Sequence, residues 1–352
     1  MKPFDPRLTL ARPDLAALAL EGRLAAERYA QPAARQVVAP IAGLYRLPNG
    51  VLDDQLLFGE RFDVLAVEGD FAWGQARRDG YVGWVETRRL GETLSSPSHW
   101  VSALGAYAFS EASLKTKPVG RLSMNALVTV EAEEGRYRKL AGSGWVVAEH
   151  LSPVGVFAAD PAAEALKFLG APYLWGGRSS EGLDCSGLIQ QAHYACGLSG
   201  PRDSDMQAEL GSPAPGDLRR NDLVFWKGHV GIMLDEANLL HANGHHMATV
   251  AEPLSEAAAR IEAAGAGAPT GFRRLSAAGA AGAAAGAAAV AGAASAGVAA
   301  ALAAGIGGGE AAWVRSQAIR LIRSSTFFRP TKVIFVPAMS FWGAARKVLI
   351  LS

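Results

Sequence analysis

A single cysteine stands out among the residues that could do chemistry. Cys185 lies in the stretch GLDCSGLIQQAH, and the chain has only one other cysteine, Cys196. Asp184 is a good cap for a helix that begins at Cys185, and a thiol at the positive end of a helix dipole is shifted toward the thiolate. The pattern favours a nucleophile, although a lone cysteine is more often a small buried side chain, and a metal ligand is a third alternative.

A thiolate nucleophile needs a base, and two of the seven histidines are well placed to supply one. His229 begins a predicted strand in KGHVGIML, and His241 lies at the end of the next one in NLLHANG. Adjacent antiparallel strands would place the two imidazoles side by side, with His229 accepting the thiol proton and His241 holding its tautomer. The same three side chains could instead bind zinc, but this set without a paired Cys-x-x-Cys is unusual for a structural site, so no metal is predicted.

The elements that would position these residues predict an α+β domain over residues 158–275. The stretch DPAAEALKFLG is typical of a helix, with Asp160 as its N-cap, Pro161 in its first turn and Gly170 as its stop. A second helix is predicted to begin near Cys185, and the stretches DLVFWKGHVGIMLD, NLLHANG and TGFRRL predict strands. A helix that precedes a small sheet is an α+β order.

Residues 36–92 carry a different pattern, in which short runs alternate apolar and polar positions between the turn signals PNG, EGD and RDG. This spacing predicts a small, strongly bent barrel. Residues 93–157 repeat the plan, and both copies have an acidic turn, a Gly-containing turn, the triplet GWV and a closing Leu. The two copies resemble bacterial SH3-like domains, so we expect tandem barrels with Trp84 and Trp145 in their cores.

The two ends of the chain differ from this body. Residues 1–35 are predicted to form an N-terminal helical segment, because Asp14 is placed to cap a short helix that reaches about Tyr29. Residues 276–352 begin with an almost pure Ala and Gly run and end in a basic stretch, which predicts a poorly ordered tail. Ala and Gly bury too little apolar area to drive membrane insertion, so membrane association is not expected.

The charge and the cysteine content limit which partners and which cellular compartment the sequence predicts. The chain of 352 residues has a net charge of +1, but residues 276–352 hold seven basic residues and one acid, while the remainder holds 27 and 32. This balance gives no indication of a nucleic-acid partner. Two cysteines do not make a disulfide framework, and charged residues and prolines interrupt the first thirty residues, so no secretory signal is predicted. We therefore expect a cytoplasmic protein, with export by another route left open.

Five motifs together resemble a known family. APYLWGG, GLDCSGLIQQAHYACGL, PRDSDMQ, GDLRRNDLVFWKGHVGIML and LLHANG occur in the order expected of the NlpC-type, papain-like cysteine peptidases. With the SH3-like repeats in front, residues 36–275 resemble the γ-D-glutamyl-L-diamino acid endopeptidases of peptidoglycan turnover. The resemblance implies a papain-like domain without a cofactor, in which Cys185 is the nucleophile, His229 the general base and then acid, and His241 the group that orients it. The backbone N–H of Cys185 would help to bind the oxyanion.

The resemblance also implies a set of substrate-binding residues. Asp184 and Ser186 match positions that bind the free amine of the substrate's L-Ala, although Asp184 also suits a simple helix cap. Tyr173 and Trp175 match positions that line the same pocket, although they could also be core aromatics. Asp203 and Ser204 match a further pair that contacts substrate, although they could also only make a turn. Glu60 and Tyr81 are candidates that reach toward the pocket from the first barrel, although they could also be ordinary barrel surface.

The implied substrate is a peptidoglycan-derived stem peptide, L-Ala-γ-D-Glu followed by a diamino acid. A groove that is walled at one end, with a carboxylate aimed at an ammonium, accepts only a free N-terminus, and the first barrel would form part of that wall. Two other functions stay open: an amidase or acyltransferase on the same fold, and a non-catalytic protein that binds cell wall. The diamino acid, the oligomeric state, the role of the second barrel and the role of residues 276–352 are not specified.

Overall fold

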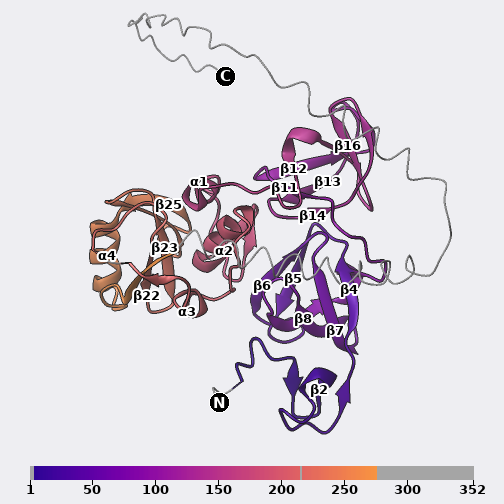
Figure 1. The fold of residues 1–352 in the computed structure, drawn as a ribbon, viewed down its shortest axis with the longest axis horizontal. Helices are drawn as coiled ribbons and strands as arrows, with labels where there is room; N and C mark the ends of the chain where they lie inside the picture. The colour runs from indigo at the N-terminus through magenta and orange to yellow at the C-terminus, as the bar shows by residue number, and fades with distance from the viewer. Residues whose placement is uncertain (1–3, 215, 276–352) are drawn as a thin grey trace, which may run out of the picture. The chain divides into compact units, whose positions relative to one another are not determined.

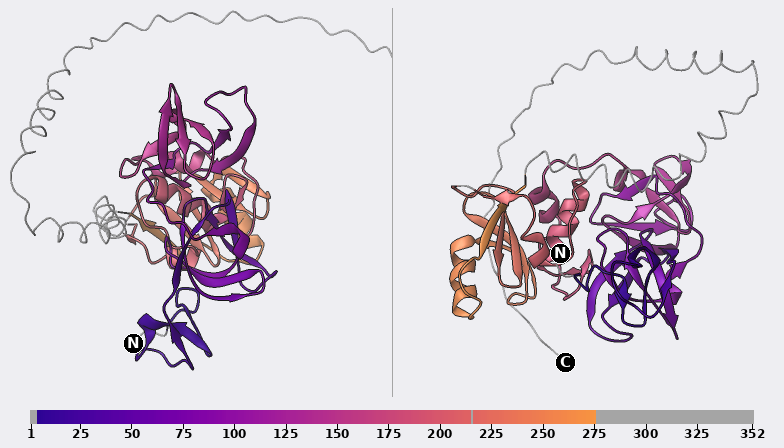
Figure 2. Two further views of the ribbon diagram at one scale, coloured as in Figure 1. Left: turned by 90° about the vertical axis from the view of Figure 1, so that its right-hand side faces the viewer. Right: turned by 60° about the horizontal axis from the view of Figure 1, so that its bottom comes forward.

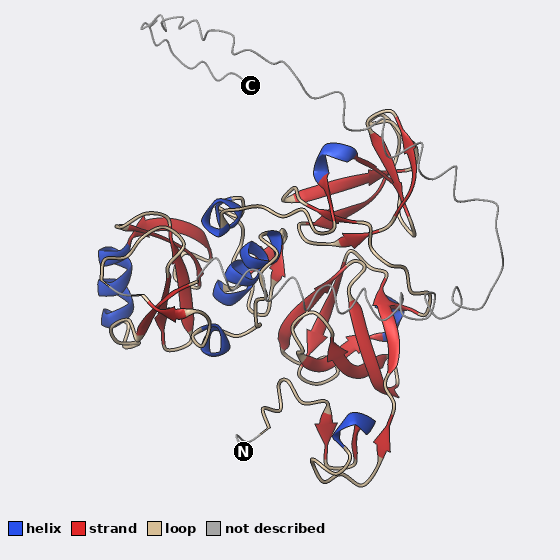
Figure 3. Ribbon diagram, viewed as in Figure 1, coloured by secondary structure: helices blue, strands red, loops and turns tan. Residues whose placement is uncertain are grey.

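The computed structural model describes residues 4–214 and 216–275 (Figure 1). The predictions for residues 276–352 lie outside the described residues. Within the described part, α-helices occur only between residues 161 and 263, and strands are the main regular elements before them (Figure 3). Among residues 4–214 and 216–275, none of the helices combines the length and the hydropathy that a membrane span requires.

Residues 33–91 form a seven-stranded antiparallel sheet, which we call the first strand set. Its hydrogen-bonded order is β10-β4-β7-β8-β9-β5-β6. Alternating apolar residues such as Leu44, Leu56, Phe62 and Val85 are buried in its core, which confirms the period-two pattern of the sequence. The strands are β4 (Ala33–Val37), β5 (Ile41–Tyr45), β6 (Leu52–Leu57), β7 (Arg61–Glu68), β8 (Phe71–Ala76), β9 (Val82–Glu86) and β10 (Leu90–Gly91).

Residues 99–153 form the second strand set, which is divided into a three-stranded sheet, β14-β11-β18, and a five-stranded sheet, β13-β12-β17-β16-β15. If β14 and β15 are counted together as the counterpart of β7, this order repeats that of the first strand set. The internal repeat therefore exists in the strand order, while closure into barrels stays a prediction. The strands are β11 (His99–Val101), β12 (Gly105–Phe109), β13 (Pro118–Ser123), β14 (Leu127–Val128), β15 (Val130–Glu134), β16 (Tyr137–Leu140), β17 (Trp145–Val147) and β18 (Leu151–Pro153).

The helix predicted between Asp14 and Tyr29 is wrong. These residues form β2 (Leu15–Ala17), a 3₁₀ turn η1 (Leu18–Leu20) and β3 (Tyr29–Ala30), while β1 (Ala11–Arg12) pairs with β2. Asp14 pairs with Arg12 instead of capping a helix. The apolar residues of this segment have partners on the first strand set, and this tertiary burial outweighs a weak local helix propensity. The resulting cluster contains Leu10, Leu15, Phe71, Trp73 and Trp84.

The tryptophans of the two GWV triplets therefore differ. Trp84 is buried, but against the N-terminal segment and not in the main core of the first strand set. Trp145 is only partly buried, so its predicted place in a second core is wrong. The core of the second strand set is instead formed by smaller residues such as Val101, Leu122 and Leu140.

The elements between residues 158 and 275, which we call the α+β domain, include a six-stranded antiparallel sheet of order β21-β26-β22-β23-β24-β25, while the bounds of a separate domain stay a prediction. In Figures 1 and 2, α2 lies on one side of this sheet and α4 on the other. The helices are α1 (Pro161–Leu166), α2 (Cys185–Ala195), α3 (Ser204–Gln207) and α4 (Leu254–Ala263). The strands are β19 (Arg178–Ser179), β20 (Gly182–Leu183), β21 (Ser212–Pro213), β22 (Leu223–Trp226), β23 (His229–Met233), β24 (Asn238–Asn243), β25 (Ala248–Pro253) and β26 (Gly271–Arg274).

Local signals explain where the helices begin. The Asp160 carboxylate caps α1 by accepting from the Ala162 N–H at 3.2 Å, and Gly170 has the left-handed φ of 79° that ends this segment. Helix α2 begins at Cys185 and is buried along its whole length, because it packs on α1, on β23 and β24 of the sheet and on β19. Both helix starts confirm the sequence-based predictions.

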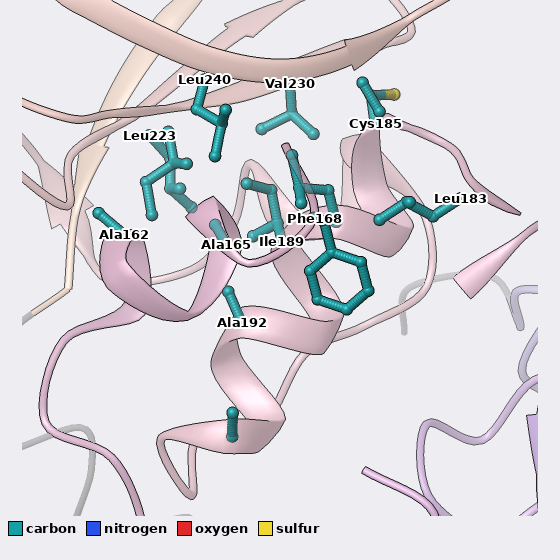
Figure 4. Packing of buried hydrophobic residues seen from close by; sticks show 14 of the residues in the cluster. Ala162, Ala165, Phe168, Leu183, Cys185, Ile189, Ala192, Leu223, Val230 and Leu240 are labelled. Carbon is teal, nitrogen blue, oxygen red and sulfur yellow. The ribbon is translucent and has the colours of Figure 1, made fainter. Parts of the chain in front are cut away.

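The core of the α+β domain lies between α2 and one face of the sheet (Figure 4). In Figure 4, Cys185 stands at the first turn of α2, and the side chains of Val230 and Leu240 point from the sheet toward the helix. Trp100 and Met124 of the second strand set belong to the same buried cluster. Burial of each large apolar side chain contributes about 1.5–3 kcal/mol, so this cluster holds the start of α2 firmly against β23.

Candidate active site

The Cys185 thiol lies where the first turn of α2 meets the beginning of β23. The side chain is 7% exposed, and its Sγ lies 4.0 Å from the carbonyl oxygen of Gly228, the residue before His229. Asp184 has an extended backbone and caps the helix, with its Oδ1 accepting from the Gly187 N–H at 2.8 Å. A Cβ on Gly187 would lie only 2.3 Å from the Gly177 carbonyl oxygen, so this close approach requires glycine.

The resting charge of the thiol differs from the sequence-based expectation. Burial, together with the neighbouring Asp184 carboxylate, raises the pKa of Cys185 to about 12. The N–H of Val230 and the Arg202 guanidinium act in the opposite direction but do not reverse it. The thiolate expected from the helix dipole alone is therefore wrong for the free protein, because loss of hydration penalises the anion more strongly.

The two histidines lie side by side, as the strand pattern predicts. His229 Nε2 is 2.8 Å from His241 Nδ1, so one ring donates a hydrogen bond to the other. Burial, together with the neighbouring His241 and Arg260, lowers the pKa of His229 to about 3. A neutral imidazole at the start of β23 is able to accept a proton. Within the described residues, no hydrogen bond joins the Cys185 thiol to either ring.

Beyond the two histidines lies a carboxylate that the sequence patterns did not identify. His241 Nε2 is 2.6 Å from Glu252 Oε1, and Glu252 also pairs with Arg260 of α4. In the β24–β25 register His241 lies opposite Val250, so Glu252, two residues further on, is on the same face of the sheet. That alternation would have indicated Glu252 if the pairing of the two strands had been known.

Asp184 and Ser186, predicted to bind an amine, are both buried and bonded to the same arginine. Arg202 donates to Asp184 Oδ2 at 2.6 Å, to Asp184 Oδ1 at 3.0 Å and to Ser186 Oγ at 3.0 Å. Ser186 Oγ also donates to Asp184 Oδ1 at 3.2 Å. The helix-cap role of Asp184 is thus present, and the positive charge of Arg202 offsets the negative charge of this carboxylate.

Tyr81 and Asp203 are brought together from distant parts of the sequence. The Tyr81 hydroxyl donates to Asp203 Oδ2 at 3.0 Å, so the first strand set does reach a predicted substrate-contacting residue. Arg7 of the N-terminal segment donates to the same oxygen at 2.8 Å. The Asp203 side chain keeps 27% of its surface exposed, whereas that of Asp184 keeps 9%. Asp203 is therefore the more open of the two carboxylates.

The remaining pocket candidates differ in exposure. Tyr173 is partly buried and packs against the core, and the pKa of its hydroxyl is raised by burial and by nearby Cys185 and Asp184. Trp175 is 61% exposed, which excludes a core role and leaves its ring available for contact. Ser204 begins the short helix α3, directly after Asp203.

Glu60 is not an exposed group on the wall of a groove. It is 1% exposed, and Arg178 binds it through two parallel hydrogen bonds of 3.0 and 2.5 Å. Arg78 donates to Glu60 Oε1 at 2.8 Å, and the Leu57 N–H donates to Oε2 at 3.1 Å. The prediction that Glu60 reaches toward substrate is corrected: it reaches the α+β domain, but as a buried partner of Arg178.

Glu60 is one end of a line of alternating charges that we call the buried ion chain. Arg178 joins Glu60 to Asp54, whose Oδ1 accepts from Arg178 Nε at 3.1 Å and from Arg202 Nε at 2.6 Å. Arg202 then joins Asp54 to Asp184 at the start of α2. Arg178 and Arg202 are among the largest fully buried side chains of the described residues. The sequence patterns missed both arginines, because a buried arginine is recognised only through partners far away in the chain.

Two family profiles match parts of this sequence. The profile of the NlpC/P60 family matches residues 170–260, which include Cys185, His229 and His241. The profile described as the bacterial dipeptidyl-peptidase Sh3 domain matches residues 44–90, within the first strand set.

Curated relatives and a solved structure resemble a larger part of the chain. Over 217 residues the chain is 33% identical to the gamma-D-glutamyl-L-lysine dipeptidyl-peptidase of Bacillus subtilis, covering 55% of this chain and 73% of the relative. It is 33% identical over 243 residues to dipeptidyl-peptidase 6 of Lysinibacillus sphaericus, covering 59% and 86%. The crystal structure of an NlpC/P60 family protein from Bacillus cereus superposes with a TM-score of 0.59 at 20% identity, covering 69% of this chain and 99% of that one, which indicates a shared fold.

Proposed function

The chain belongs to the NlpC/P60 family and is a cysteine peptidase, and from this membership we propose that it cleaves the γ-D-glutamyl–diamino acid bond of peptidoglycan stem peptides with a free N-terminal L-Ala. One observation carries the proposal: the Cys185 thiol at the start of α2 faces the start of β23, where His229 and His241 form a neutral hydrogen-bonded pair. Support for the bond comes from two relatives named for cleavage at γ-D-glutamyl-L-lysine.

The proposed reaction begins with a protonated thiol and a neutral base. Because the pKa of Cys185 is raised to about 12 and that of His229 lowered to about 3, the proton stays on sulfur until attack. Sγ then bonds to the scissile carbonyl carbon as His229 takes the thiol proton, and the backbone N–H of Cys185 donates to the developing oxyanion. Such hydrogen bonds are often long in the free enzyme and tighten with substrate.

The second half of the reaction returns the enzyme to its starting state. The carbon–nitrogen bond breaks, and the diamino acid amine leaves with the proton held by His229. Water then attacks the thioester, with His229 as its base, and the sulfur leaves as the thiol when it regains the proton. The products are L-Ala-γ-D-Glu and the remaining peptide.

The free amine is proposed to bind between the first strand set and the α+β domain. Asp203 offers a partly exposed carboxylate, and Tyr81 from the first strand set holds it. Asp184, Ser186, Tyr173, Trp175 and Ser204 are proposed to form the rest of the pocket. A wall at this position would explain why a peptidase with this domain removes a dipeptide and does not cut within a polymer.

Two further parts of the proposal concern the second strand set and the cellular location of the protein. The second strand set is proposed to be a second SH3-like domain, supported by the strand order that it shares with the first. A cytoplasmic role in recycling cell-wall peptides is proposed, since both cysteines of the chain are free thiols and a reducing compartment keeps thiols in this form.

The test is mass spectrometry of products from L-Ala-γ-D-Glu-meso-diaminopimelate and from the same peptide with an acetylated N-terminus. The full-length protein should release L-Ala-γ-D-Glu from the free peptide only. Cys185→Ala should release none, because no side chain would remain to attack the carbonyl carbon. Equal cleavage of the acetylated peptide would contradict the walled groove, and cleavage by Cys185→Ala would contradict the nucleophile.

A further inference from the structure

We propose that Glu252 is a fourth functional member of the site: a positioning residue that sets the tautomers of His241 and His229, and so decides which nitrogen of His229 can accept a proton. The inference rests on the proposed roles of Cys185 and His229. It assigns no new chemistry to Glu252, whose carboxylate acts only through the two rings. The four side chains form a line from the start of α2 to the edge strand β25.

The contacts of His241 determine where its proton lies. Its Nε2 has two polar neighbours, Glu252 Oε1 at 2.6 Å and Asn243 Nδ2 at 3.1 Å. The carboxylate requires a proton on Nε2, whereas the amide requires a bare nitrogen. A charge-assisted hydrogen bond is shorter and about twice as strong as a neutral one. The bond to Glu252 is therefore favoured over the bond from Asn243, and Nε2 of His241 carries the proton.

The tautomer of His241 then fixes that of His229. Since Nε2 of His241 is protonated in the neutral ring, Nδ1 is bare and must accept from its neighbour 2.8 Å away. That neighbour is Nε2 of His229, which therefore carries the proton of the His229 ring. The Nδ1 of His229 is left as the bare nitrogen, which is the one that can receive the proton of the Cys185 thiol.

Asn243 supplies the competing arrangement. Its amide orientation is fixed, because Oδ1 accepts from the His246 N–H at 2.9 Å, which leaves Nδ2 facing His241. Without Glu252, Nδ2 would donate to Nε2 of His241 and move the proton of that ring to Nδ1. His241 would then donate to His229, whose own proton would lie on Nδ1 and block the base.

The contacts of Glu252 keep its carboxylate in place as the acceptor for Nε2 of His241. Arg260 of α4 pairs with Glu252 Oε1, which holds this oxygen against His241. The charged and titratable groups around His241 are His229, Glu252, Arg260 and His246. Burial lowers the pKa of His241 while Glu252 raises it, so Glu252 also stabilises the positive charge that reaches the pair when His229 takes a proton.

The first experiment compares variants of the full-length chain. Glu252→Met removes the acceptor and should lower kcat/KM on L-Ala-γ-D-Glu-meso-diaminopimelate on the order of 10⁴-fold, the scale of a wrong histidine tautomer in a serine protease triad. Glu252→Gln keeps an oxygen that Arg260 and His241 can share but loses the charge, so its loss should be about 10-fold. Glu256→Gln, an exposed change on α4, is the matched control and should retain wild-type kcat/KM.

A rescue variant separates positioning from structural support. Asn243→Asp in the Glu252→Met background places a carboxylate oxygen beside Nε2 of His241 and keeps an acceptor for the His246 N–H. This second change should recover most of the lost kcat/KM, which restoring general stability would not do. A Glu252→Met protein that unfolds at the wild-type temperature and cleaves at the wild-type rate would overturn the proposal.

The tautomers themselves are measured by NMR of histidine labelled with ¹⁵N, at a pH where both rings are neutral. The wild type should carry its ring protons on Nε2 of His229 and Nε2 of His241, and Glu252→Met should move both to Nδ1. A wild-type His229 protonated on Nδ1 would overturn the inference. This readout needs no peptide, so it tests Glu252 even if the proposed substrate is not cleaved.

Discussion

The first strand set meets the α+β domain through charged side chains, whereas the second meets it mainly through apolar ones. The buried ion chain runs from Glu60 and Asp54 of the first strand set to Asp184 at the start of α2. The second strand set contributes Trp100 and Met124 to the core around α2. It also makes polar contacts: Asn125 Nδ2 donates to the backbone oxygen of Gln191 at 2.9 Å, and Ser123 Oγ accepts from the Ser180 N–H at 2.8 Å.

The two kinds of contact have different physical consequences. Apolar burial is non-directional and stabilises in proportion to the area removed from water. A buried ion pair adds little net stability, because desolvation offsets the attraction, but its bidentate geometry permits only one arrangement. We therefore expect the second strand set to hold α2 in place and the first to decide the geometry at its first residue, Cys185.

The largest effect is expected for Arg202→Met, which breaks the buried ion chain beside the nucleophile. Asp54 and Asp184 would lose their shared partner, and removing one member of a buried pair destabilises by about 3–5 kcal/mol. Misplacement of the start of α2 should also lower kcat/KM by about 10²-fold in the protein that remains folded. Chemical denaturation gives the unfolding free energy, and steady-state cleavage of the proposed peptide gives kcat/KM.

Two conservative changes serve as comparisons for Arg202→Met. Arg202→Lys keeps the charge but not the two parallel bonds, so it should lose less stability while still lowering kcat/KM. Arg77→Lys alters a single, partly exposed pair with Asp63 in the first strand set and should change neither quantity. Wild-type kcat/KM in folded Arg202→Met would show that the first strand set does not position the site.

The next largest effect is expected for Trp100→Ala, which tests the second strand set. Trp100 is buried in the core around α2, and truncation of such a side chain lowers the free energy of unfolding by about 3–5 kcal/mol. At a temperature where the variant stays folded, kcat/KM should remain at the wild-type value, because no ion pair at Asp184 is altered. A loss of kcat/KM as large as that of Arg202→Met would remove the distinction between the two strand sets.

A smaller effect is expected for Tyr81→Phe, which removes the hydrogen bond from the first strand set to Asp203. Loss of a bond to a charged group should raise KM about tenfold for a peptide with a free amine. Burial raises the pKa of Asp203 and the Tyr81 hydroxyl counteracts it, so the variant should raise that pKa further. Asp203 is ionised only above its pKa. Because the variant raises this pKa, the acid limb of the pH profile of kcat/KM should move to higher pH.

The control for Tyr81→Phe is Tyr107→Phe, at an exposed tyrosine of the second strand set. It should leave KM and the pH profile unchanged. If the acid limb of the pH profile of kcat/KM does not shift in Tyr81→Phe, a group other than Asp203 binds the free amine of the substrate.

The smallest effect is expected for Arg7→Ala. Arg7 pairs with Asp203 and Asp205 near the surface, and exposed ion pairs contribute about 0–1 kcal/mol to stability. Removing its charge leaves more negative potential at Asp203, so KM for the peptide with a free amine should fall slightly. Measurement at low and high salt checks the cause, since screening should abolish the difference. A rise in KM would place Arg7 among the groups that shape the pocket.

Local sequence was sufficient to predict the parts of this site that depend on neighbouring residues. The start of α2 follows from Asp184 as a cap, and the strands that carry His229 and His241 follow from short apolar runs between turns. The repeat of the strand plan was also visible in the sequence, because each copy has the same turns in the same order. Motif resemblance then indicated the nucleophile and the two histidines.

Local sequence could not supply what depends on long-range pairing. Arg202 and Asp54 are 148 residues apart, and Arg178 and Glu60 are 118 apart, so only the folded chain shows that these charges neutralise one another in the interior. Burial also reversed two expectations: it keeps the thiol of Cys185 protonated, and it turns the segment after Asp14 away from a helix. The type of a residue fixes its chemistry, but hydration and partners decide its charge, and both are set by tertiary structure.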